Sequence, residues 1–243
     1  MKFLNAIVAF GTTLLLAVTL VAAGFAAVAV PDWATEALSR AYSGCDQPNT
    51  PFSQDELVNL AVAGKHYTFD DNNPLKLQSA LEAANNSAEG AGRAKSTDRA
   101  SITRTLDDDA KSHLDDVFKV VKVAKPVLAV IAIVTIGGLA HVGVRMKKRA
   151  LGRVLACGGS IVIVAFAALG AWAAYDFLGM FNTLHSLFFS AGSWQFDIDS
   201  LLITMYPTAF WMGMGGIWLA VTAVLSILSI IIGLKLGKQK HDK

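Results

Sequence analysis

The sequence contains few charged residues and only two cysteines, and both shortages exclude large classes of protein. Charged side chains make up 16% of the 243 residues and hydrophobic ones 53%, whereas soluble domains are about a quarter charged. Together with a mean hydropathy of +0.47, this composition indicates a membrane protein. Cys45 and Cys157 are too few and too far apart in the sequence for a disulfide framework or a zinc site.

Several common functional motifs are also missing. The sequence has no GxGxxG, Walker A, HExxH or GxSxG pattern, and these patterns are typical of dinucleotide-binding, phosphate-binding, zinc-protease and serine-hydrolase sites. It has no basic run interleaved with aromatic residues, so nucleic acid is not an expected partner.

Four hydrophobic segments have the length of about 20 residues that a membrane-spanning helix needs. The predicted spans are residues 3–30, 126–144, 154–175 and 210–234. The end of the first span lies within AAVAVPDW, residues 26–33, which is similar to a signal-peptide cleavage site, so cleavage stays an alternative, although the span exceeds the ~7–15-residue apolar core of such signals. Small residues in the spans should allow close helix packing, namely Gly137, Gly138, Gly158, Gly159, Gly213 and Gly216.

The charges of the connecting segments predict which side of the membrane each segment occupies. Residues 145–153 carry five basic side chains and no acid, and the tail 235–243 carries four basic side chains and one acid. Residues 31–122 carry ten basic and fifteen acidic side chains, and 176–207 are also net negative. By the positive-inside rule, 145–153 and both termini are expected to be cytoplasmic, and the two acidic segments extracytoplasmic.

The long outer segment is expected to be mainly helical. Residues 52–69, FSQDELVNLAVAGKHYTF, begin with a polar cap and continue with apolar residues at helical spacing. Residues 72–84 and 107–126 also have a helical pattern, whereas 85–100 are small and polar, as in a loop. The predicted fold class is therefore an all-α polytopic membrane protein with four transmembrane helices and a mainly helical extracytoplasmic segment between the first and second.

Two histidines are expected at the outer face, near the membrane surface. His113 precedes the second span and His185 follows the third, so the fold could bring them together. Asp116 is on the helix face of His113 and would favour the charged imidazole. Apolar neighbours of His185 would favour its neutral form, namely Phe188, Phe189, Trp194 and Phe196. Such a pair suits acid–base chemistry; the alternative is an interfacial histidine among belt aromatics.

The other candidate groups point to no covalent mechanism. Loop serines adjoin His185, but no Ser/His/Asp pattern is present, and Cys45 has no neighbouring histidine. A reaction of proton transfers, with the nucleophile supplied by the substrate, fits better. His66 stays a weaker candidate, and His141 and His241 are not expected to do chemistry. Two histidines and an aspartate could ligate zinc, but their spacing is not a recognised pattern, so no cofactor is expected.

Two segments resemble the signatures of the bacterial lipoprotein intramolecular transacylase (Lit) family. They are HLDDV, residues 113–117, and HSLFFSAGSWQFDIDSLLITMYPTAFW, residues 185–211. The length, four spans and long outer segment are also similar to that family. The resemblance implies a bacterial cell-membrane acyltransferase, which moves an acyl chain from the diacylglyceryl group of a lipoprotein to the α-amino group of its N-terminal cysteine. Thr208 follows Pro207, where many relatives have an acid, and this departure bears on the substrate contacts.

The resemblance places His113 and His185 at the reaction centre. We expect His113 to act as the base, oriented by Asp116, and His185 to protonate the leaving glyceryl oxygen, without an acyl-enzyme. Contacts to the oxyanion or to the lipid are expected from Ser193, Trp194 and Phe196. The implied partners are diacylglyceryl-cysteine lipoproteins and membrane lipids, and a monomer is favoured.

Two other functions stay open on the sequence alone. One is a non-enzymatic sensor or accessory protein whose acidic outer segment binds another protein. The other is an outer-leaflet phospholipid hydrolase, which would activate water and release free fatty acid.

Overall fold

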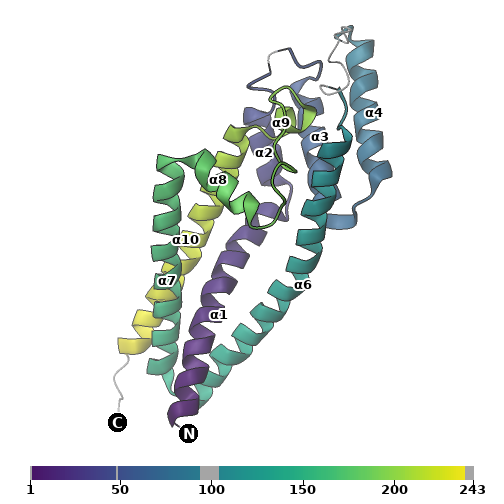
Figure 1. Cartoon of the computed structure of the whole chain (residues 1–243). Coiled ribbons are helices and arrows are strands. Elements are labelled where there is room, and N and C mark those ends of the chain that lie inside the picture. Colours follow the sequence, from purple (N-terminus) through teal and green to yellow (C-terminus); the bar gives the residue numbers. More distant parts are fainter. Residues whose placement is uncertain (1, 48, 94–103, 239–243) are drawn as a thin grey trace. The chain divides into compact units, whose positions relative to one another are not determined.

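The chain is built from helices, as Figure 1 shows for the computed structural model, which describes residues 2–47, 49–93 and 104–238. No β-strand occurs within those ranges. The elements are α1 (Lys2–Ala29), α2 (Trp33–Tyr42), α3 (Gln54–His66), the π-helix η1 (Tyr67–Asp71), α4 (Pro74–Gly90), α6 (Asp108–Arg145), α7 (Lys148–Tyr175), α8 (Phe177–Ser186), α9 (Leu201–Met205) and α10 (Thr208–Lys238).

Four of these helices, α1, α6, α7 and α10, are long and apolar enough to cross a membrane. The all-α fold with four candidate membrane helices confirms the predicted fold class. The helices extend further than the apolar runs, since only Met146 and Lys147 separate α6 from α7 and α10 continues to Lys238. Most of the basic connection predicted at 145–153 is therefore helical, because lysine and arginine are good helix formers once outside the apolar layer. The end of the predicted tail, 239–243, lies outside the described residues.

The chain divides into two compact units. The first comprises Met1–Ala27, Ala124–Asp176 and Ile217–Lys243, and the second comprises Val28–Val123 and Phe177–Gly216. The candidate site residues named above all belong to the second unit.

The first unit is a packed set of apolar helices. Ala17 of α1 is buried with Val162 and Phe166 of α7, and Trp218 of α10 packs against this cluster. Polar side chains add contacts between helices, since Thr19 and Thr135 share a hydrogen bond of 2.9 Å. Helix association within lipid depends on such close packing and hydrogen bonds, because lipid is as apolar as the helix surfaces.

Glycines allow close helix approach in both units. A Cβ on Gly159 would lie 2.6 Å from the Ser226 carbonyl oxygen, and one on Gly138 would lie 2.5 Å from the Thr12 hydroxyl. Gly158, and Gly213 in the second unit, are also confined by their neighbours, whereas a Cβ on Gly137 would meet no atom of the described residues within 4 Å. Gly216 is similarly open. Packing therefore explains four of the six glycines noted in the sequence.

Replacing Gly233 by valine is expected to disrupt the contact between α7 and α10. A Cβ there would lie 2.5 Å from the Gly152 oxygen and 2.6 Å from the Ala156 nitrogen, and backbone atoms cannot rotate away. We expect the free energy of unfolding to fall by about 1–3 kcal/mol, the usual cost of overpacking. Thermal unfolding in detergent measures this loss. The matched control is Gly137→Val, and equal melting temperatures for the two variants would contradict the packing shown here.

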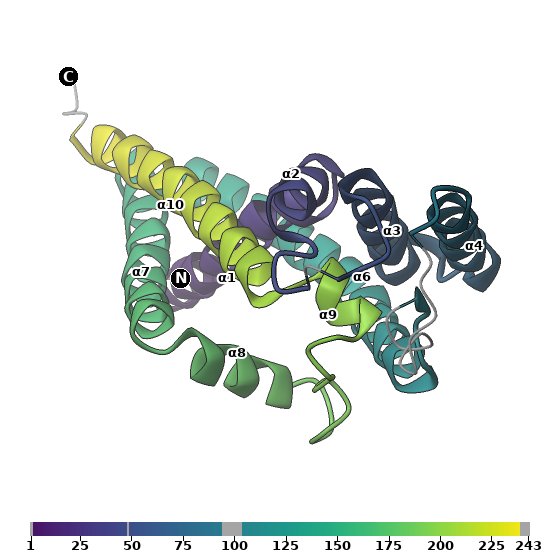
Figure 2. The ribbon, with the colours of Figure 1, turned by 90° about the horizontal axis from the view of Figure 1, so that it is seen from above.

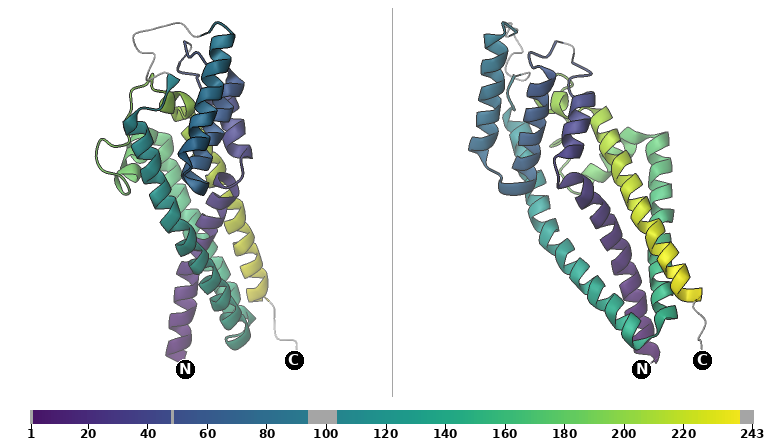
Figure 3. Two further views of the ribbon diagram at one scale, coloured as in Figure 1. Left: turned by 90° about the vertical axis from the view of Figure 1, so that its right-hand side faces the viewer. Right: turned by 180° about the vertical axis from the view of Figure 1, so that it is seen from behind.

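The second unit packs α3 between its helical neighbours. Figures 2 and 3 show α2, α3 and α4 side by side, and α3 also contacts α9. A capping box begins α3, in which Ser53 and Glu56 bind each other's backbone N–H; the sequence had predicted only a polar cap here. The core is apolar, and its largest fully buried side chains include Leu57, Leu60, Leu106, Leu201, Met205 and Phe210.

Two predicted loops are shorter in the structure. Helix α4 continues to Gly90, so the first residues of the loop predicted at 85–100 are helical, and residues 94–100 lie outside the described residues. The segment 176–207 contains α8 and α9 on either side of a short irregular stretch. Both helices were missed because their apolar residues were assigned to the membrane surface rather than to a packed face.

Only part of α6 can lie in a membrane. The helix has 38 residues and is about 57 Å long at ~1.5 Å per residue, whereas the hydrocarbon layer is ~30 Å thick. Its first half is charged, with Asp108, Asp109, Lys111, Asp115, Asp116, Lys119, Lys122 and Lys125. The apolar part begins at Pro126, so His113 lies outside the segment that spans the membrane.

Candidate active site

His113 and His185 lie close together in the second unit. Their ring centroids are 6.4 Å apart and their ring planes differ by 27°. The two residues are 72 positions apart in the sequence and lie on different helices, α6 and α8. The proximity expected from the sequence is therefore present in the structure.

The first turns of α6 are fixed by a cap and a buried stripe. The Asp107 carboxylate accepts a hydrogen bond of 2.7 Å from the Ala110 N–H, which satisfies a free donor of the helix N-terminus. Leu106, Ala110 and Leu114 are buried at intervals of four residues. His113 adjoins this buried stripe, so the anchoring of α6 sets its position.

The backbone of α8 fixes the tautomer of His185. Its Nδ1 lies 2.9 Å from the carbonyl oxygen of Phe181, one helical turn earlier. A carbonyl only accepts hydrogen bonds, so Nδ1 carries the hydrogen and Nε2 of the neutral ring has a free lone pair. The Phe181 ring also lies 3.9 Å from the imidazole and 6.0 Å from the ring of Trp211, both between centroids.

Aromatic rings surround both imidazoles. Phe189 adjoins both imidazoles, with its ring centroid 5.0 Å from that of His113 and 5.7 Å from that of His185. Phe196 lies 5.6 Å from His113, and Trp194 lies 5.0 Å from His185. Three of the four expected aromatic residues therefore surround the histidines, whereas Phe188 is 62% exposed. We call the rings of Phe181, Phe189, Trp194 and Phe196 the aromatic cage. Sequence reasoning missed Phe181, although its position four residues before His185 on a helix was the available signal.

The cage holds both histidines in the neutral form near pH 7. Burial lowers the pKa of His113 to about 4; the nearby His185 lowers it further, and Asp116 opposes the shift. Burial also lowers the pKa of His185, against an opposing effect of its hydrogen bond to Phe181. The expectation that His113 favours its charged form is therefore wrong, because the loss of hydration outweighs the attraction of Asp116.

Asp115, rather than Asp116, links this part of α6 to its surroundings. Asp116 accepts a hydrogen bond of 2.7 Å from Lys119, and Nδ1 of His113 is buried without a hydrogen-bond partner among the described residues. The Asp115 carboxylate accepts hydrogen bonds from the Tyr67 hydroxyl at 2.6 Å and the Asn72 amide at 3.0 Å. Asp116 therefore does not orient Nδ1 of His113 as predicted.

A tight turn, Ser190–Trp194, brings Trp194 to His185. The Ser193 hydroxyl and its backbone N–H both donate to the Ser190 carbonyl, at 2.9 and 3.2 Å. Gly192 has a φ of +85°, a conformation that favours glycine. The hydroxyl hydrogen of Ser193 is thus committed within the turn, whereas the indole Nε1 of Trp194 is buried without a partner among the described residues.

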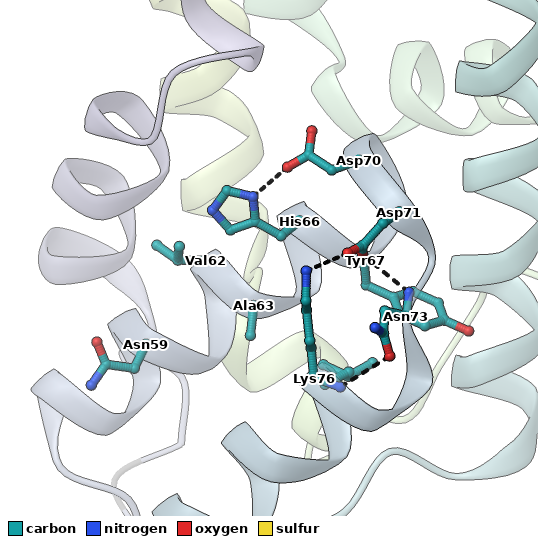
Figure 4. Close-up of a pocket in the computed structure, with 10 residues that line it drawn as sticks. Asn59, Val62, Ala63, His66, Tyr67, Asp70, Asp71, Asn73 and Lys76 are labelled. Carbon is teal, nitrogen blue, oxygen red and sulfur yellow. Dashed lines mark hydrogen bonds and ion pairs between the residues drawn. The ribbon is translucent and has the colours of Figure 1, made fainter.

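His66 lies in a separate pocket, shown in Figure 4. The pocket has a volume of about 410 Å³, and neither His113 nor His185 lines it. One ring nitrogen of His66 faces Asp70 and the other lies 3.2 Å from Asp32. Both ring nitrogens are therefore already engaged by carboxylates. Over the described ranges, no group of three or more His, Cys, Asp or Glu side chains has a metal-binding arrangement.

Comparison of the sequence with known families gives one match. The model of the family described as "Lipoprotein intramolecular transacylase Lit" matches residues 48–211, about two thirds of the chain, including both histidines of the cage. The chain belongs to the Lit family. No curated protein matches its sequence.

Solved structures of the membrane-integral Lit from Bacillus cereus share the fold of this Lit-family chain. One superimposes with a TM-score of 0.74 at 17% identity and covers 98% of both chains. Two others, which carry a substitution of one histidine, give TM-scores of 0.68 at 16% identity; each covers 98% of this chain, and they cover 93% and 95% of their own. Membership of the Lit family and the four apolar helices identify a multi-pass membrane protein of a lipoprotein acyltransferase family.

Proposed function

We propose that this Lit-family protein moves one acyl chain from the diacylglyceryl group of a lipoprotein to the α-amino group of the same N-terminal cysteine. The observation that carries the proposal is the pair of half-buried, neutral histidines surrounded by aromatic rings. The reaction needs a base for the amine, and the substrate supplies both nucleophile and ester. Because the amine and the ester belong to one molecule, no encounter between two molecules is needed. Well-aligned intramolecular reactions of this kind have effective molarities of ~10⁵ M or more.

His185 is the general base in this mechanism, a role expected of His113 from the sequence, and it keeps its expected role of protonating the leaving oxygen. Its Nδ1–H is engaged by the Phe181 carbonyl, so Nε2 is the atom that accepts a proton. His185 removes one proton from the attacking amine and delivers it to the leaving glyceryl oxygen. A single histidine thereby conserves the proton, and no acyl-enzyme is needed.

His113 stays neutral and positions the amine. Its pKa of about 4 makes it a weak base, and a charged His185 nearby disfavours a second charge. Its buried Nδ1 has no hydrogen-bond partner within the described part of the chain, so it can accept an N–H of the substrate amine. The apolar rings of Phe189 and Phe196 exclude water and face the lipid part of the substrate.

The pH dependence of the reaction reports the lowered pKa of His185. The substrate amine has a pKa of about 8, so log(kcat/KM) should fall with a slope of one below that pH. A slope of two should begin only below the ordinary histidine pKa of 6.5, because burial lowers the pKa of His185 and the base is lost as it becomes protonated. Initial rates between pH 5 and 9 measure this, and a slope of two above pH 7 would contradict a desolvated base.

The acidic second unit is proposed to face the outside of the cell membrane, with the basic connection between α6 and α7 inside. Cys45 is exposed, so a membrane-impermeant maleimide should label it in intact cells of a Cys157→Ala variant. Partial desolvation is the main reason why the pKa of the Cys45 thiol is raised. Labelling is best done at pH 8, because the thiolate is the reactive form. In the matched control, Cys45→Ser with Lys148→Cys, labelling should require permeabilised cells; the reverse pattern would refute this orientation.

Purified protein and a synthetic diacylglyceryl lipopeptide test the proposed reaction. Because the acyl chain stays within the molecule, the product has the same mass as the substrate. Fragmentation in the mass spectrometer should show one acyl group on the amine and one on the glyceryl oxygen. Release of free fatty acid would indicate a hydrolase, and an unchanged fragmentation pattern would indicate that the protein has no such activity.

A further inference from the structure

The indole N–H of Trp194 is an unused hydrogen-bond donor inside the cage. Its Nε1 is buried, and the described residues offer it no acceptor. Buried tryptophan N–H groups usually have a partner, and leaving a buried donor unsatisfied costs about 1–3 kcal/mol. A bound ligand that supplies the acceptor would explain this arrangement.

The neighbours of Trp194 show which kind of ligand group fits. Its ring lies 5.0 Å from the ring of His185, and the unpartnered Nδ1 of His113 belongs to the same cluster. An indole nitrogen only donates hydrogen bonds, so the ligand must present an acceptor atom. A substrate that presents its amine to the histidines places its ester beside them, and the ester carbonyl is such an acceptor.

The hydroxyl of Ser193, the donor expected from the sequence, is already engaged. The Ser193 hydroxyl and its backbone N–H both bind the Ser190 carbonyl. Using the Ser193 hydroxyl would require this turn to rearrange, whereas the Trp194 N–H needs no new geometry. The donor expected from the sequence at Ser193 is thus replaced by its neighbour.

We infer that the Trp194 indole N–H donates a hydrogen bond to the ester carbonyl oxygen and stabilises the oxyanion formed there. This inference rests on the function proposed above. The amine nitrogen attacks the carbonyl carbon, and the π electron pair moves to the oxygen that Trp194 binds. When the carbonyl re-forms, the bond to the glyceryl oxygen breaks, and that oxygen keeps the electron pair. It takes the proton that His185 removed from the amine.

The expected effect is on kcat more than on KM. The oxyanion accepts a stronger hydrogen bond than the ester carbonyl, so Trp194 stabilises the transition state more than the bound substrate. Removing one such donor typically lowers the rate by ~10²–10³-fold. A purely structural role would instead alter folding, or kcat and KM together.

Two replacements of Trp194 separate its N–H from its ring. Trp194→Phe keeps an aromatic ring, and β-(3-benzothienyl)alanine at the same position keeps the bicyclic shape with sulfur in place of N–H. Both should lower kcat at least ~100-fold with KM changed less than about threefold, in the fragmentation assay on the synthetic lipopeptide. The matched control is Trp33→Phe, because Trp33 lies on α2 and is 48% exposed; it should retain the wild-type rate.

A binding measurement gives an independent test. A lipopeptide with an acetylated amine cannot react, so it occupies the site as an ester. It should bind more tightly than its diether analogue, which lacks the carbonyl, by a factor within the threefold limit set for KM, and both Trp194 replacements should abolish this difference.

The outcomes distinguish the inference from the proposed function. If the benzothienyl variant retains the wild-type kcat, or still binds the ester more tightly than the ether, the N–H is not the oxyanion donor, while the wild-type activity still supports the acyl transfer. If the wild-type protein forms no product, the proposed function fails and this inference fails with it.

Discussion

His185→Ala is expected to lower kcat for acyl migration by about 10³-fold, within the range of ~10²–10⁴ that general acid–base catalysis contributes. The substitution removes the only atom that the mechanism uses to carry the proton, Nε2 of a ring fixed by the Phe181 carbonyl. The aromatic cage is otherwise retained, so KM should change little. Single-turnover rates on the synthetic diacylglyceryl lipopeptide separate the chemical step from binding.

The matched control for this variant is His66→Ala. His66 belongs to the same unit and pairs with Asp32 and Asp70 in the separate pocket. It should retain the wild-type rate. If His66→Ala lost activity and His185→Ala retained it, the reaction would belong to the pocket of Figure 4 rather than to the cage.

His113→Ala is expected to lower kcat/KM by about 10²-fold, because a lost hydrogen bond to the reacting amine allows it to take unproductive positions. The loss should be smaller than for His185→Ala, because His113 positions the amine without carrying the proton. The double variant His113→Ala/His185→Ala should be little slower than His185→Ala alone, since groups that act on one step have non-additive effects.

Ser112→Ala is the control for His113, because Ser112 is the exposed neighbour on the same helix. It should have the wild-type rate, which would show that the effect comes from the imidazole and not from a disturbed α6. A His113→Ala rate within threefold of wild type would exclude a role for His113 in binding the amine.

The membrane helices could be predicted from the sequence because one property, a long apolar run, decides them. The charged first half of α6 was recognised as a helix that leads into the second span, and the structure shows one helix from Asp108 to Arg145. Helices α8 and α9 could not be predicted in the same way. They are 10 and 5 residues long, and such short helices depend on packing against other elements for their stability.

The pairing of His113 with His185 was predictable from topology and family resemblance, but the details of the site were not. Asp115 and Asp116 are adjacent, and one step along a helix turns a side chain by about 100°. Only the positions of Tyr67 and Asn72 show that Asp115 is the anchored carboxylate. Likewise, Ser193 and Trp194 are neighbours, and the geometry of the turn decides that the serine is engaged while the indole N–H has no acceptor among the residues that the structure describes.

Burial explains why the charge state of His113 was predicted wrongly. The sequence shows a carboxylate three residues away, but it does not show Phe189 and Phe196 packed on the imidazole. Desolvation by burial, together with the nearby His185, lowers the pKa of His113 to about 4 despite Asp116. Long-range packing, which spacing along one helix cannot reveal, therefore determines the acid–base roles.

A crossover experiment tests the central claim most directly, namely that the two histidines in the aromatic cage catalyse acyl migration within one lipopeptide. Two lipopeptides of different peptide mass, one with deuterated and one with ordinary acyl chains, are mixed with the purified protein. Fragmentation should show N-acylated products in which each peptide keeps its own acyl label, with wild-type protein and not with His185→Ala. Products in which one peptide carries the other peptide's acyl chain would contradict the account. Products lighter than the substrate by one acyl chain, which would indicate hydrolysis, would also contradict it.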